Sequence, residues 1–88
     1  MTIEVSKHPY AETFRVTFDR IGRHRDVKPL IVRVHWEEAA DELAARIYGY
    51  ARKFLVSSDP EVIVNIEEMR GSLGLGRFGE FTLEEVQA

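Results

Sequence analysis

The stretch WEEAADELAARIYGYARKFL, residues 36–55, decides the fold of this chain because it predicts a single amphipathic helix. At about 100° per residue, its apolar side chains fall on one side of the helix. These side chains are Trp36, Ala40, Leu43, Ala44, Ile47, Ala51, Phe54 and Leu55. Gly49 falls on the polar side. An apolar stripe of this kind needs a partner surface, and the segments before and after it predict a β-sheet.

Alternating apolar and polar residues predict the strands of that sheet. The clear signals are residues 13–21, 30–35 and 61–67, and a short one covers residues 3–5. Residues 61–67 are apolar on both faces, which favours a central position in the sheet. The last segment, residues 80–86, reads as an edge strand, although Thr82 and Glu85 also fit the capping box of a helix.

The sequence therefore predicts a single α+β domain over residues 1–88, in the order β-β-β-α-β-β. Three to five antiparallel strands form a small sheet, and the helix packs on one face. Residues 22–29 and the glycine-rich residues 69–79 are expected to be connections. The outer face of the sheet would carry polar residues together with Ile31 and Ile63.

The composition of the chain is that of an ordinary globular protein, with 44% hydrophobic and 31% charged residues among 88. There is no cysteine, which excludes disulfides and thiolate metal sites. No apolar run reaches the roughly 18–20 residues that span a bilayer. The first ten residues lack the pattern of a secretory signal, so we expect a cytoplasmic protein without membrane contact. Nine of the twelve basic residues are arginine, which hints at a bacterium or a phage.

Basic residues gather between the second and third predicted strands, although the whole chain has a net charge of −3. Arg20, Arg23, Arg25 and Lys28 lie in or beside the loop, and Arg33 could extend the patch across the sheet. A basic loop of this kind predicts contact with phosphates, so nucleic-acid binding is one candidate function. Against it stand the sequence pI of about 5.6 and the absence of aromatic residues from the loop.

The segment GLGRFG, residues 74–79, matches the dinucleotide-binding pattern G-x-G-x-x-G. That site needs a helix, a second strand and an acidic residue about twenty positions further on, but only nine residues follow. We interpret the match as coincidence. The segment is nevertheless pliant and apolar, so it either folds back over the core or contacts a partner. The candidate contact residues are Leu73, Leu75, Arg77 and Phe78.

Catalysis and metal binding have little support in the sequence. The three histidines are His8, His24 and His35, and His35 forms an H-x-E-E pattern with Glu37 and Glu38. A zinc site needs three or four converging ligands, which this pattern does not supply. No nucleophile, base and oxyanion donor occur together. We therefore expect no enzymatic activity, no cofactor and no metal.

The favoured hypothesis is a small protein that acts by contact with another protein. The partner is either a different chain or a second copy that pairs with an exposed sheet edge to form a homodimer. Nucleic-acid binding through the basic loop is the alternative.

Overall fold

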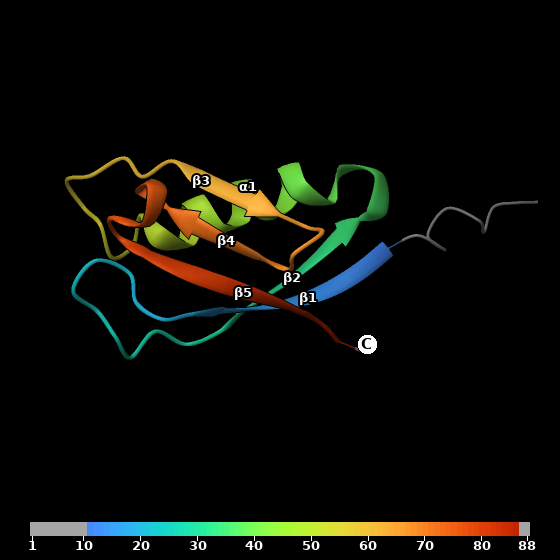
Figure 1. The fold of residues 1–88 in the computed structure, drawn as a ribbon, viewed down its shortest axis with the longest axis horizontal. Coiled ribbons are helices and arrows are strands. Elements are labelled where there is room, and N and C mark those ends of the chain that lie inside the picture. Colours follow the sequence, from blue (N-terminus) through green and yellow to red (C-terminus); the bar gives the residue numbers. More distant parts are fainter. Residues whose placement is uncertain (1–10, 87–88) are drawn as a thin grey trace, which may run out of the picture.

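The computed structural model describes residues 11–86, and Figure 1 shows them as one helix packed against a five-stranded sheet. The strands are β1 (Ala11–Phe18), β2 (Leu30–His35), β3 (Val62–Asn65), β4 (Arg70–Leu73) and β5 (Gly79–Glu85). The helix is α1 (Ala39–Ala51), and two short 3-10 helices are η2 (Trp36–Glu38) and η3 (Gly74–Gly76).

All neighbouring strands of the sheet are antiparallel, in the spatial order β2-β1-β5-β4-β3. Helix α1 contacts β2 and β3, the two outermost strands, so the sheet curls around it. The predicted α+β class is confirmed. Within the described residues the chain order is β-β-α-β-β-β, and the predicted strand at residues 3–5 lies outside them.

The core lies between α1 and the concave face of the sheet. Strands β1, β2 and β5 turn alternate side chains inward, as the sequence pattern predicts. The buried apolar residues are Phe14, Val16, Phe18, Ile21, Val32, Val34, Ala39, Leu43, Ile47, Ala51, Leu55, Leu73, Phe81 and Leu83. No polar or charged side chain among the described residues is buried.

The helix is shorter than the sequence predicts. It begins at Ala39 after a 3-10 turn and ends at Ala51 instead of Leu55. Ala39 is buried and Ala40 is exposed, because the buried side of α1 follows the four-residue spacing of Ala39, Leu43, Ile47 and Ala51. Leu55 still reaches the core from the turn after the helix. The side chain of Trp36 lies outside the described part of the structure.

Two predicted positions in the sheet are wrong. Strand β3 lies at an edge instead of the centre, and Ile63 on its outer face is 40% exposed. Strand β5 lies at the centre between β1 and β4, where an edge was predicted, but the choice of a strand over a helix is confirmed. Apolar residues on both faces of a strand therefore do not establish a central position here, because Ile31 and Ile63 on the outer face of the sheet are exposed within residues 11–86.

Strand β4 lies inside the segment that the sequence predicts to be a connection. Its residues, RGSL, are poor strand formers by composition. The strand exists because it lies between β3 and β5, with both of which it pairs. Tertiary pairing thus overrides the local preference of Gly71 and Ser72.

Candidate functional site

Three connections gather at the end of the molecule that holds the C-terminal end of α1 (Figure 1). They are residues 19–29 between β1 and β2, residues 52–61 between α1 and β3, and residues 74–78 between β4 and β5. We call these three segments the loop surface. The basic loop and the glycine-rich segment, which the sequence presents as separate candidates, therefore lie side by side.

Arg20 fastens two of the three segments together. Its guanidinium group donates hydrogen bonds to the carbonyl of Gly22 at 2.9 Å, to that of Arg77 at 3.2 Å and to that of Gly76 at 3.4 Å. A planar fork of donors suits this simultaneous contact with several carbonyls. The sequence predicts that Arg20 contacts nucleic acid, but in the structure its donors bind the protein's own backbone.

Backbone hydrogen bonds complete the connection. The N–H of Gly22 donates to the carbonyl of Phe78 at 2.7 Å, and the N–H of Gly74 donates to the carbonyl of Glu61 at 2.7 Å. Ile21 and His24 exchange backbone hydrogen bonds of 2.9 and 3.0 Å, so a tight turn starts the basic loop. These bonds join the three segments into one surface rather than three independent loops.

Aromatic side chains support the same surface from α1. The rings of His24 and Phe54 lie 5.2 Å apart, and the hydroxyl of Tyr50 donates to the carbonyl of Lys28 at 2.8 Å. Phe54 follows the helix, and Tyr50 lies in its last turn. The C-terminal end of α1 and the turn after it therefore hold the basic loop in position through Tyr50 and Phe54.

Two large apolar side chains project from the loop surface. Leu75 is 74% exposed and Val56 is 78% exposed, the highest values among the large apolar residues of the described chain. Leu75 has a φ of 58°, between Gly74 at 60° and Gly76 at 95°. Three consecutive left-handed residues turn the leucine outward. For a leucine this backbone conformation is uncommon and costs energy.

The loop surface is also cationic. Its segments contain seven Lys/Arg and four Asp/Glu, a net charge of +3, whereas the whole chain has −3. The exposed cations are Arg23, Arg25, Lys28, Arg52, Lys53 and Arg77. The guanidinium of Arg77 lies 5.8 Å from the centre of the Phe78 ring. This contact holds the positive charge of Arg77 next to an apolar side chain of the glycine-rich segment. Arg52 and Lys53 belong to this surface, although no sequence pattern includes them in it.

The four candidate contact residues of the glycine-rich segment have different positions. Leu73 is fully buried at the end of β4, so it supports the segment from within the core. Phe78 is half-buried and packs against the core. Leu75 and Arg77 are exposed. The segment thus packs onto the core through Leu73 and Phe78 and exposes Leu75 and Arg77 to solvent.

The five candidate nucleic-acid contacts are also divided. Arg23, Arg25 and Lys28 are exposed on the loop surface, and Arg20 is held by carbonyls. Arg33 lies on β2, outside the loop surface, and is exposed on the outer face of the sheet. The structure therefore brings three of the five together.

The glycine pattern at residues 74–79 has a structural role that differs from nucleotide binding. It leads from β4 through η3 into β5, so a strand follows it where the dinucleotide site has a helix. Gly79 has a φ of 138°, and a Cβ atom there would lie 2.0 Å from the carbonyl oxygen of Arg20. This close approach explains why the position holds glycine.

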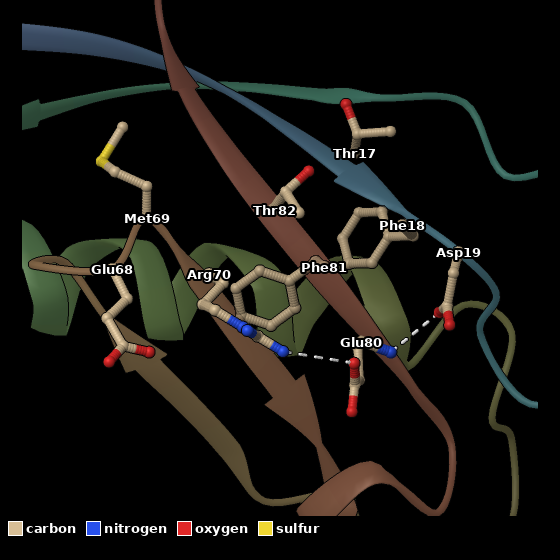
Figure 2. A pocket seen from close by; sticks show the side chains of 9 residues that line it. All are labelled: Thr17, Phe18, Asp19, Glu68, Met69, Arg70, Glu80, Phe81 and Thr82. Carbon is tan, nitrogen blue, oxygen red and sulfur yellow. Dashed lines mark hydrogen bonds and ion pairs between the residues drawn. The ribbon is translucent and has the colours of Figure 1, made fainter.

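A pocket of about 350 Å³ opens across β1, β5 and the start of β4 (Figure 2). Phe18, Phe81 and Met69 form its apolar part, and the other lining side chains are polar or charged. Arg70 and Glu80 form an ion pair at 3.8 Å, and the carboxylate of Asp19 accepts the backbone N–H of Glu80 at 2.8 Å. The other lining residues are Thr17, Glu68 and Thr82.

His35 contacts a different carboxylate from those that the sequence pattern suggests. Both its backbone N–H, at 2.8 Å, and its ring Nδ1, at 3.3 Å, lie within reach of the Glu42 side chain. The hydrogen bond from the backbone N–H of His35 lowers the pKa of Glu42. The interaction joins the end of β2 to the first turns of α1, seven residues later. The sequence pattern misses it because the 3-10 turn between the two elements is not predicted.

Two other carboxylates, Glu12 of β1 and Glu85 of β5, lie close together at the same end of the sheet as His35. A hydrogen bond between the side chains of Glu12 and Glu85 raises the pKa of Glu12, and desolvation and the negative charge of Glu85 add smaller effects in the same direction. Among residues 11–86, no group of three His, Asp or Glu side chains is arranged to hold a metal ion.

In the described part of the chain, no helix has both the length and the apolar character needed to cross a membrane. Comparisons of the sequence and structure with protein-family models, curated proteins and solved structures found no match.

Proposed function

We propose that this chain acts by non-catalytic contact with another protein, and that the loop surface is the contact site. The observation behind the proposal is Leu75, a leucine that is 74% exposed on left-handed backbone. Nine arginines among the twelve basic residues favour an accessory protein of a bacterium or a phage, and we propose that it acts in the cytoplasm.

The energetics of Leu75 favour contact over solvent exposure. Left-handed backbone costs a residue with a side chain about 1–2 kcal/mol. Burial of a leucine side chain against a partner contributes about 1.5–3 kcal/mol of favourable binding free energy. The surrounding hydrogen bonds of Arg20 and Gly74 hold the segment in place before a partner arrives. A pre-ordered apolar anchor loses little entropy on binding.

The charge of the loop surface indicates the kind of partner. All three segments that form the loop surface carry exposed cations, and two of them carry Leu75 and Val56, so an acidic protein surface with an apolar pocket fits best. Arg77, directly beside the Leu75–Gly76 turn, is the nearest cation in the sequence. The apolar anchors would hold the complex together, and the cations would speed its formation.

The test compares proteins captured from cells of the natural host by the wild type and by two variants. Leu75→Asn removes the anchor but keeps a side chain that tolerates left-handed backbone. Ile63→Thr is the matched control, because Ile63 is an exposed apolar residue on β3, outside the loop surface. We expect Leu75→Asn to lose a specific captured protein by at least about tenfold, about 1.4 kcal/mol, and Ile63→Thr to retain it.

Equal capture by Leu75→Asn and wild type would refute the proposal. Thermal unfolding of each variant would show that lost capture does not reflect lost folding. Capture should also persist at high salt, because burial of apolar surface does not depend on screening in the way that charge contacts do.

Nucleic-acid binding is the second candidate, supported by the cations that Arg52, Lys53 and Arg77 add to the basic loop. Labelled single-stranded and duplex DNA, titrated at low and high salt, would test it. If phosphates are the ligand, affinity should fall steeply with salt and Arg23→Gln should weaken binding to every sequence. No binding at low salt would remove this candidate.

A second copy of the chain is a further candidate protein partner. The described sheet is open and ends in β2 and β3, and open edges have unpaired backbone groups that can pair with another strand.

A further inference from the structure

Strand β2 has a backbone edge that faces away from the sheet. Thr13 of β1 is paired in register with Arg33 of β2, and the Thr13 carbonyl accepts the N–H of Val86 at 2.9 Å on the β5 side. Since the backbone of Thr13 faces β5, the backbone of Arg33 faces away from β1. Alternate residues share this direction, so Ile31 and His35 also face outward.

The two ends of this edge are closed. The outward N–H of His35 donates to the Glu42 carboxylate at 2.8 Å, which agrees with the direction derived from Thr13. At the other end, Pro29 has no N–H to donate. The outward N–H and C=O groups of Ile31 and Arg33 remain between them. Within residues 11–86, these four groups have no hydrogen-bond partner.

We propose that β2 pairs with β2 of a second copy, antiparallel about a two-fold axis at Val32. Ile31 then lies opposite the partner's Arg33, and Arg33 lies opposite the partner's Ile31. Each of these two pairs exchanges two backbone hydrogen bonds, so the dimer gains four hydrogen bonds between the copies. Every outward N–H and C=O group of Ile31 and Arg33 then has a partner. The two sheets join into one continuous sheet. This contact specifies the self-association in the proposed function and uses no residue of the loop surface.

The register follows from charge and from the closed ends. If the two-fold axis instead lay at Arg33, the two arginines would lie opposite each other. Ile31 would then pair with His35 of the second copy, whose N–H already donates to Glu42. A shift that centres the pair on Ile31 places Pro29, without a donor, opposite Arg33. The register at Val32 is the one that satisfies all four groups of each copy.

Side chains on the outer face suit the same register. Ile31 is 52% exposed in the single chain, and Arg33 is also exposed. In the pair, the aliphatic part of the partner's Arg33 covers Ile31, while its guanidinium remains in water. A closed two-fold contact of this kind is the commonest form of protein self-association.

The first test is sedimentation velocity of the full chain over a wide range of concentrations. Arg33→Pro removes the outward N–H without removing a bond to β1, since proline is tolerated at such edge positions. Arg33→Ala is the matched control, because it keeps the N–H. We expect wild type and Arg33→Ala to dimerise, and Arg33→Pro to need at least tenfold higher concentration. A wild type that stays monomeric throughout, or an Arg33→Pro variant that dimerises like wild type, would overturn the proposal.

A second test does not depend on the folding of the proline variant. Because the chain has no cysteine, Ile31→Cys and Arg33→Cys each introduce a single thiol. Directly opposed residues of a hydrogen-bonded pair lie about 5.5 Å apart between Cα atoms, within the range of a disulfide. On mild oxidation of a mixture, the disulfide between the two variants should form faster than either homodimeric disulfide. Equal rates, or faster homodimeric disulfides, would exclude this register.

The self-association and the loop-surface function fail separately. Leu75→Asn should dimerise like wild type even if it loses its captured partner. If Leu75→Asn abolishes dimerisation while Arg33→Pro does not, the second copy binds at the loop surface and the β2 pairing is excluded.

Discussion

The ring of Phe81 on β5 fills the space in which a Cβ atom of Gly71 on β4 would stand. The two residues are paired in register, and a Cβ atom on Gly71 would lie 2.3 Å from the ring and 2.2 Å from the carbonyl oxygen of Ile63. A large aromatic side chain over a strand glycine is a known way to stabilise a weak strand. This pairing explains how RGSL becomes a strand inside the sheet.

Gly71→Ala should therefore destabilise the protein by at least about 2 kcal/mol, because overpacking against a ring and a backbone carbonyl forces both to move. Urea unfolding followed by circular dichroism measures the change in the free energy of unfolding. A change smaller than about 0.5 kcal/mol would mean that β4 can shift away from β5 at little cost.

Gly49→Ala should have the opposite effect. Gly49 lies in the exposed face of α1, and nothing lies within 4 Å of the position that a Cβ atom would take. Alanine is favoured over glycine in a helix interior by about 1 kcal/mol, so the free energy of unfolding should rise by about that amount. The same urea titration checks it, and unchanged stability would indicate that α1 is frayed at this position.

Arg20→Met should loosen the loop surface, because it removes three hydrogen bonds to carbonyls while keeping much of the apolar stem. We expect a loss of about 1–2 kcal/mol in the free energy of unfolding. Amide exchange of Arg77 and Phe78 should also accelerate, since these residues follow the carbonyls that Arg20 holds. Arg23→Met, at an exposed position of the same turn, is the control. Equal effects of the two substitutions would contradict the fastening role of Arg20.

Glu42 should make stability depend on pH in the acid range. Its pKa in the folded chain is below the usual value of 4.5, because its carboxylate accepts the backbone N–H of His35. A lowered folded pKa means that the stabilisation is complete above the unfolded pKa and is lost as pH falls through the folded pKa. The difference in stability between wild type and Glu42→Gln should therefore shrink as the pH falls below about 4.3.

Unfolding measured in urea at a series of pH values would follow this difference. His35→Ala is the informative control, because it removes the ring but keeps the backbone donor, so most of the acid dependence should remain. Parallel curves for wild type and Glu42→Gln at every pH would show that the hydrogen bond does not favour the ionised carboxylate.

The residues at alternate positions of β1 and β2, and those spaced by three and four in α1, determined the class of the fold by themselves. Phe14 and Val32 face inward, and Leu43 and Ile47 are fully buried, because the period of each element places them on one side. The antiparallel pairing of β1 and β2 also followed from the short connection between them. The exposed leucine and arginine of the glycine-rich segment were identifiable as candidates, although not as parts of a larger surface.

Tertiary structure alone decided the order of the strands, the existence of β4 and the joining of three connections into the loop surface. Periodicity states which face of a strand is apolar, but it does not state which strand lies beside it. That choice depends on contacts between residues distant in sequence, such as Phe81 with Gly71 and Arg20 with Gly76. The outward edge of β2 is likewise invisible in sequence, because the direction of a backbone N–H depends on which neighbour the strand already has.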